Sequence, residues 1–124
     1  MRDGVELTER IRTAVPTLAA SQVDELARVV VRLVSKLAPV RIYVFGSQPR
    51  GEATADSDID LLLVVPRSEE PSYRLAQAAY RAAVPYTCSL DILVMSNEEF
   101  DRRRRAVSSL PAMIMREGRV LYAA

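Results

Sequence analysis

Histidine is missing from this chain of 124 residues, and cysteine and lysine each occur once. Without histidine the chain lacks the most common general base, the Ser-His-Asp and Cys-His nucleophile systems, and every metal site that needs imidazole. Cys88 alone cannot form an internal disulfide or a thiolate zinc site. Because Lys36 is the one lysine, none is left for a phosphate-binding loop. Any catalysis must therefore use carboxylates, hydroxyls or arginines.

Long hydrophobic runs and excess charge are lacking as well. The longest apolar run, Leu61 to Pro66, is far shorter than the ~18 residues of a membrane span. The N-terminal segment MRDGVELTER is too polar for a signal peptide. The 17 basic and 16 acidic residues leave a net charge of +1, so no overall field favours nucleic acid or an anionic membrane. We expect a soluble cytoplasmic protein that does not bind membranes.

The periodicity of apolar residues predicts alternating helices and strands. A weak helix is expected over 5–15, ended by Pro16, and a clearer amphipathic helix over 22–37, opened by a capping box of Ser21 and Asp24. The further expected elements are buried strands over 41–45, 59–65 and 90–95, helices over 72–84, 97–107 (opened by Ser96 and Glu99) and 110–116 (ended by Gly118), and an edge strand over 119–122. The predicted fold class is α/β (α+β), a mixed sheet flanked by helices.

A glycine and a serine close the first expected strand. Gly46 lets backbone N–H groups approach a ligand, and the expected start of a short helix at Ser47 favours negative charge. The Ser47 hydroxyl either caps that helix or donates to a phosphate oxygen. Arg50, one turn later, is either a phosphate ligand or part of a surface ion pair. This turn is therefore a candidate phosphate-binding site.

Three aspartates stand at the starts of two apolar strands. Asp58 and Asp60 are two residues apart, so both carboxylates point to one face about 6 to 7 Å apart along the strand. Such a pair is costly unless cations bridge it, and clustered oxygens suit Mg²⁺ or Mn²⁺. Asp91 joins them if its strand lies beside 59–65. Three carboxylates beside a phosphate-binding turn suit two-metal phosphoryl or nucleotidyl transfer, which needs no histidine.

The run GSQPRGEATADSDIDLLLVV, with LDILV later, resembles the glycine-serine and Asp-x-Asp pattern of the DNA polymerase beta nucleotidyltransferase superfamily. The length and the closing REGRVLY resemble the stand-alone minimal nucleotidyltransferases (MNT), often encoded beside HEPN-domain proteins as toxin–antitoxin pairs. The resemblance covers about residues 22–122, and Pro49 departs from the usual pattern. It implies one small nucleotidyltransferase domain over 1–124, with a motif core at 41–95 and a weakly defined N-terminal extension at 1–20.

The resemblance also implies roles for individual residues. Gly46 and Ser47 would hold the nucleoside triphosphate, with Arg50 as a further candidate ligand. Asp58 and Asp60 would bind both metal ions, while Asp91 would bind the catalytic ion and help activate the acceptor hydroxyl.

The activity implied by the resemblance is Mg²⁺-dependent transfer of NMP, AMP from ATP above all, to a hydroxyl group of a HEPN-type toxin. Two Mg²⁺ ions are expected, with Mn²⁺ as an alternative. So small a chain leaves little room for an acceptor pocket, which favours a partner protein or a second copy that supplies it. Two alternatives stay open, namely a small-molecule acceptor, as in antibiotic nucleotidyltransferases, and a non-catalytic antitoxin that occludes its toxin.

Four consecutive arginines, Arg102 to Arg105, lie in the helix expected over 97–107. They span more than one helical turn, so at least one is expected to meet the core or a partner. A solvated face and contact with an acidic partner or nucleic acid are the two interpretations, and the neutral net charge argues against nucleic acid.

Overall fold

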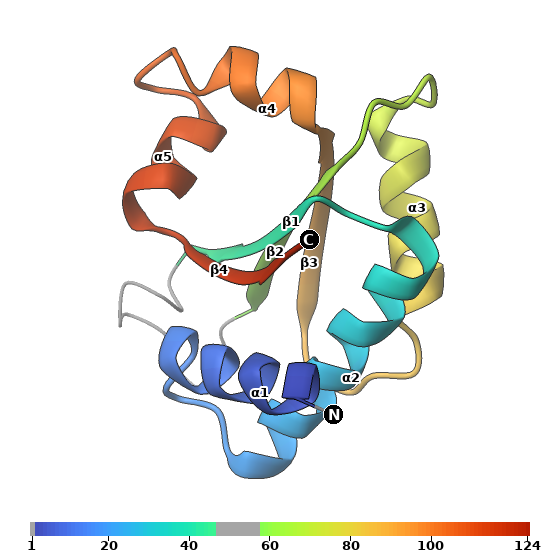
Figure 1. Ribbon diagram of the computed structural model, residues 1–124, viewed down its shortest axis with the longest axis vertical. Helices are drawn as coiled ribbons and strands as arrows, with labels where there is room; N and C mark the ends of the chain where they lie inside the picture. The colour runs from blue at the N-terminus through green and yellow to red at the C-terminus, as the bar shows by residue number, and fades with distance from the viewer. Residues whose placement is uncertain (1, 47–57) are drawn as a thin grey trace.

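The computed structural model describes residues 2–46 and 58–124 of the chain (Figure 1). In chain order the elements are α1 (Arg2–Ala14), α2 (Ala20–Leu37), β1 (Arg41–Phe45), β2 (Ile59–Val65), α3 (Ser72–Ala83), β3 (Leu90–Ser96), α4 (Asn97–Arg103), α5 (Leu110–Glu117) and β4 (Arg119–Ala123). Within the described ranges, no helix is long and apolar enough to cross a membrane.

The strands of the described residues form one four-stranded mixed sheet in the order β3-β2-β1-β4. β1 pairs antiparallel with both β2 and β4, whereas β2 and β3 are parallel. A parallel pair needs a crossover connection, and α3 provides it. The sheet with helices on its faces confirms the predicted fold class, and β4 lies at an edge as expected.

Alternating side chains of the strands build a core on each face of the sheet. In Figure 1, α2 and α3 lie on one side of the sheet and α4 and α5 on the other. The larger core, under α1, α2 and α3, includes Leu61, Leu63 and Ile92. The smaller core, under α4 and α5, includes Leu62 and Phe100. Period-two alternation thus lets each strand contribute to both cores.

The N-terminal segment, weakly patterned in the sequence, forms α1 and enters the larger core. Leu7, Ile11 and Ala14 recur at intervals of four and three, and all three are buried together with Val15. The helix begins and ends slightly before the expected 5–15, and Pro16 follows it.

The predicted capping box of Ser21 and Asp24 is wrong. α2 begins at Ala20, two residues earlier than expected, so both residues lie inside its first turns with exposed side chains. The Gln22 side-chain oxygen instead accepts a hydrogen bond from the Ala19 N–H (2.8 Å). A glutamine at the third position of a helix can accept this N-terminal capping hydrogen bond as a glutamate would.

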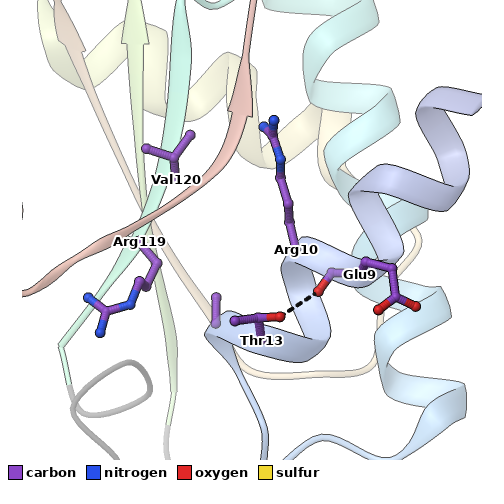
Figure 2. A pocket seen from close by; sticks show the side chains of 6 residues that line it. Glu9, Arg10, Thr13, Arg119 and Val120 are labelled. Atoms are coloured by element: carbon purple, nitrogen blue, oxygen red, sulfur yellow. Dashed lines mark hydrogen bonds between the residues drawn. The ribbon is translucent and has the colours of Figure 1, made fainter.

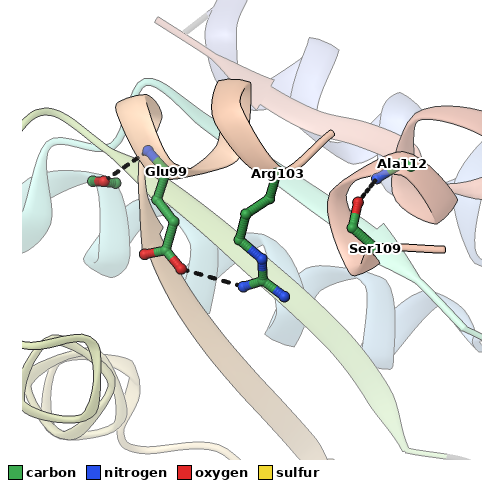
Figure 3. Close-up of polar contacts among 5 residues, drawn as sticks. Glu99, Arg103, Ser109 and Ala112 are labelled. Atoms are coloured by element: carbon green, nitrogen blue, oxygen red, sulfur yellow. Dashed lines mark hydrogen bonds and ion pairs between the residues drawn. The ribbon is translucent and has the colours of Figure 1, made fainter. Parts of the chain in front are cut away.

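α4 begins as predicted but ends at Arg103, four residues early. The Ser96 hydroxyl accepts from the Glu99 N–H (3.1 Å), which confirms the cap. The Glu99 carboxylate turns to Arg103 (3.2 Å), and Ser109 then caps α5 by accepting from Ala112 N–H (3.2 Å) (Figure 3). Because the chain must turn to reach this second cap, the helix stops.

Because α4 ends early, the four consecutive arginines do not all lie in the helix. Arg102 and Arg103 lie in the helix, while Arg104 and Arg105 lie in the turn after it, and all four are exposed. Arg104 approaches Asp101 at 3.9 Å. None of the four side chains meets the core, which agrees with a solvated face, and contact with a partner stays a prediction.

Candidate active site

Asp60 and Asp91 are direct neighbours on the two parallel strands. The register of β2 and β3 pairs Asp60 with Asp91, and Ile59 with Leu90 before them. Neighbouring strands lie about 4.8 Å apart, so side chains of paired residues stand side by side on one face. Asp58 immediately precedes β2. The condition set for Asp91, a strand that lies beside 59–65, is therefore met, and it places Asp91 next to Asp60.

Asp60 is placed at the margin of the smaller core. Its strand neighbours Ile59 and Leu61 are buried in the larger core on the opposite face. Leu62, two residues on, is fully buried under α4 and α5. Asp60 itself is half-buried, whereas Asp91 is exposed. The buried neighbours of Asp60 therefore fix the face of the sheet on which its carboxylate lies. Because Asp60 lies within the strand, its presence is not explained by a turn.

The negative charges at this end of the sheet act on one another. Burial raises the pKa of Asp60 above its usual value, and the negative charges of Asp91 and Asp58 raise it further. A positive charge placed beside Asp60 would lower its pKa again. This is the electrostatic setting expected of carboxylates that share a cation.

Gly46 follows β1 and faces Asp60. Its φ of +80° lies in the left-handed region that favours glycine. A Cβ atom added there would overlap the Asp60 oxygen Oδ2. The close approach of a ligand at Gly46 stays a prediction, whereas the structure shows that the Asp60 carboxylate leaves no room for a Cβ there. Ser47 and Arg50, the other predicted nucleotide ligands, lie outside the described residues.

Two hydroxyls that the sequence analysis did not select contact the aspartates. The Ser89 hydroxyl donates to Oδ1 of Asp58, and the Ser89 carbonyl accepts from the Ile59 N–H (2.9 Å). The Tyr80 hydroxyl lies 3.3 Å from Oδ1 of Asp91. Tyr80 comes from α3 and Ser89 from the connection between α3 and β3, and no sequence motif falls on either segment. Of the two, only Ser89 could have been selected from the sequence, because it directly precedes the strand that carries Asp91.

Two charged residues of α2 hydrogen-bond to the segment before β3. The Glu25 carboxylate accepts from the N–H groups of Thr87 (2.8 Å) and Cys88 (3.1 Å). Arg32 donates to the Pro85 carbonyl (2.7 Å). Burial opposes ionisation of Glu25, but these hydrogen bonds outweigh it and lower its pKa. The attachment fixes the chain just before the serine that contacts Asp58.

The donor set fits a hard divalent cation by its chemistry, since carboxylate oxygens are the ligands that Mg²⁺ and Mn²⁺ prefer. In the part of the chain that the structure describes, no three His, Cys, Asp or Glu side chains are grouped closely enough to hold a metal ion. The carboxylates of Asp58 and Asp91 are engaged by Ser89 and Tyr80 instead. The pKa of Asp60 is raised, so a cation placed beside it would stabilise its charged form.

A shallow groove of about 260 Å³ lies away from these aspartates, between α1 and β4 (Figure 2). Its lining residues are Glu9, Arg10, Thr13, Ala14, Arg119 and Val120. None of the three aspartates lines it, so the groove and the carboxylate cluster are separate features.

Comparison with known proteins agrees with this arrangement. A family model of the nucleotidyltransferase domain matches residues 23–117. The crystal structure of a candidate nucleotidyltransferase from Sulfolobus solfataricus superposes with a TM-score of 0.53 at 25% identity, over 81% of this chain and 79% of that one. No curated protein sequence matches significantly. The aspartate pair thus lies within the matched segment, and the chain belongs to the nucleotidyltransferase domain family.

Proposed function

We propose that the protein transfers AMP from ATP to a hydroxyl group of a partner protein, using divalent ions held by Asp58, Asp60 and Asp91. The observation that supports this most directly is the register that sets Asp60 beside Asp91. Two Mg²⁺ ions are proposed, with Mn²⁺ as a substitute. When bound, such ions lower the pKa of an attacking hydroxyl and neutralise charge on the leaving group.

The chain's own residues have separate tasks in this proposal. Asp60, half-buried and crowded by negative charge, gains most from a bound cation. Asp58, whose Oδ1 accepts from the Ser89 hydroxyl, would supply a second carboxylate to hold the ion. The acceptor oxygen forms a bond to the α-phosphorus, the bond from that phosphorus to the bridging oxygen breaks, and pyrophosphate leaves. Asp91 is exposed on an edge strand and takes the acceptor's proton.

The partner we propose is a HEPN-domain toxin, with this chain as the antitoxin that inactivates it by modification. The resemblance to minimal nucleotidyltransferases motivates this choice. The exposure of Asp91 on β3, at the edge of the sheet, supports an acceptor that approaches from outside the chain. The cytoplasm is the compartment in which such a pair would meet.

The test combines the purified protein with the HEPN-domain protein encoded beside it, labelled ATP and Mg²⁺. We expect the partner to gain the mass of one nucleotide or more, and the gain to disappear with EDTA. The Asp58→Asn, Asp60→Asn double variant should transfer nothing. If that variant silences the toxin as well as the wild type does, occlusion and not catalysis is the basis of function. Modification of an aminoglycoside-like small molecule in place of the protein would move the acceptor to the antibiotic class.

A further inference from the structure

Tyr80 connects the crossover helix to the strand that carries Asp91. Its phenolic oxygen accepts a hydrogen bond from the Ile92 N–H (2.8 Å) and lies 3.3 Å from Oδ1 of Asp91. The side chain is half-buried and packs against the larger core. One hydroxyl therefore contacts both the backbone of β3 and the carboxylate on it.

The direction of the hydroxyl proton follows from these two contacts. A phenol has one proton to donate, and a backbone N–H can only donate. Because the Ile92 N–H occupies an acceptor position of the Tyr80 oxygen, the phenolic proton is free to point at Asp91. Phenolic hydroxyls ordinarily ionise at about pH 10. The hydroxyl thus remains a donor at neutral pH.

The helix holds this hydroxyl rigidly. Ala79 and Ala83, one turn apart on α3, are completely buried against the larger core. They fix the rotation of the helix, and with it the side from which Tyr80 reaches β3. A group positioned by a packed helix keeps its geometry better than one on a loop.

We propose that Tyr80 is a positioning residue that holds the Asp91 carboxylate in the orientation used for nucleotidyl transfer. The inference rests on the role of Asp91 in the proposed function. The hydrogen bond occupies one lone pair of Oδ1 and leaves the remaining oxygen lone pairs for a cation and the acceptor proton. Loss of such an orienting contact typically costs about 10- to 100-fold in metal affinity or activity.

The kinetic test compares Tyr80→Phe with Tyr73→Phe, which removes the same hydroxyl from the same helix. Tyr73 is 61% exposed, which makes it a matched control. With the HEPN-domain acceptor, ATP and Mg²⁺, we expect kcat of Tyr80→Phe to fall about 10-fold, with KM for ATP within about twofold of wild type. Tyr73→Phe should behave as the wild type. Equal kcat values in the two variants would overturn the proposal.

A measurement that needs no enzymatic activity keeps the inference separate from the proposed function. In the wild-type protein, exchange of the phenolic proton for deuterium should shift the ¹³C resonance of the Asp91 carboxyl. In Tyr80→Phe, the three-bond couplings about the Cα–Cβ bond of Asp91 should change from one rotamer to an average. If the wild type transfers no nucleotide, the proposed function fails, while these spectra still test the contact. No isotope shift and unchanged couplings would refute the positioning role of Tyr80.

Discussion

Replacement of Gly46 by alanine should separate the chemistry of the site from the stability of the fold. The left-handed backbone at Gly46 costs a residue with a Cβ roughly 1–2 kcal/mol. The new methyl would also overlap Oδ2 of Asp60, so that carboxylate must rotate away. Displacing a reacting group by about 1 Å costs on the order of 10²-fold in rate. We therefore expect a modest loss of stability and a large loss of activity.

The control is Gly118→Ala, at the end of α5. Its φ of −80° is ordinary, but an added Cβ would lie 2.8 Å from the Ile114 carbonyl oxygen and 3.1 Å from that of Val44. Overpacking of this kind costs about 1–3 kcal/mol. Both variants should melt lower, by about 4 °C per kcal/mol for a chain of this size.

Transfer of labelled nucleotide to the HEPN-domain partner is then measured well below both melting temperatures. Gly118→Ala should keep its rate within about threefold, whereas Gly46→Ala should lose on the order of 100-fold. If the two variants lose activity to the same extent, the contact between Gly46 and Asp60 has no special part in catalysis, and the reasoning fails.

Two further predictions concern stability. Because the folded state raises the pKa of Asp60, its ionisation destabilises the fold as pH rises. In thermal melts at pH 7, the free energy of unfolding of Asp60→Asn should exceed that of the wild type by about 0.5–2 kcal/mol. This difference should disappear below pH 3.8, where Asp60 is protonated in both states. Glu25 has a lowered pKa, so its contribution to stability is present above pH 4.5 and is lost as the pH falls through its folded-state pKa. At pH 7, Glu25→Gln should be about 1 kcal/mol less stable than the exposed control Asp24→Asn in urea melts, and this difference should shrink as the pH falls below 4.5. An inactive but unstabilised Asp60→Asn, or a Glu25 effect independent of pH, would contradict these accounts.

Strands with strong apolar patterns were predictable from the sequence. The run from Ile59 to Val65 admits one orientation, since Asp60 is the polar residue that interrupts it. Asp91 interrupts β3 in the same way, and the resulting pair was expected before the register was known. The sequence gives this information because it depends on residues that lie close together along the chain.

The contacts that support the site could not be read from local pattern. Glu25 and Thr87 are 62 residues apart, and Tyr80 and Asp91 are brought together by the crossover of α3. Such pairs depend on how helices dock on the sheet, which local spacing does not encode. The predicted start of α2 was wrong for a related reason, since the Gln22 side chain makes the capping hydrogen bond that was expected of Asp24.

The first helix has a consequence for how the protein is handled. The match to the family begins at residue 23, yet Ile11 and Val15 are completely buried and Leu7 nearly so. Removing three such side chains forfeits roughly 5–9 kcal/mol of apolar burial, which is comparable to the whole stability of an ordinary domain. Trimming the polypeptide at the family boundary would therefore yield an unfolded fragment, and recombinant expression should start upstream of α1.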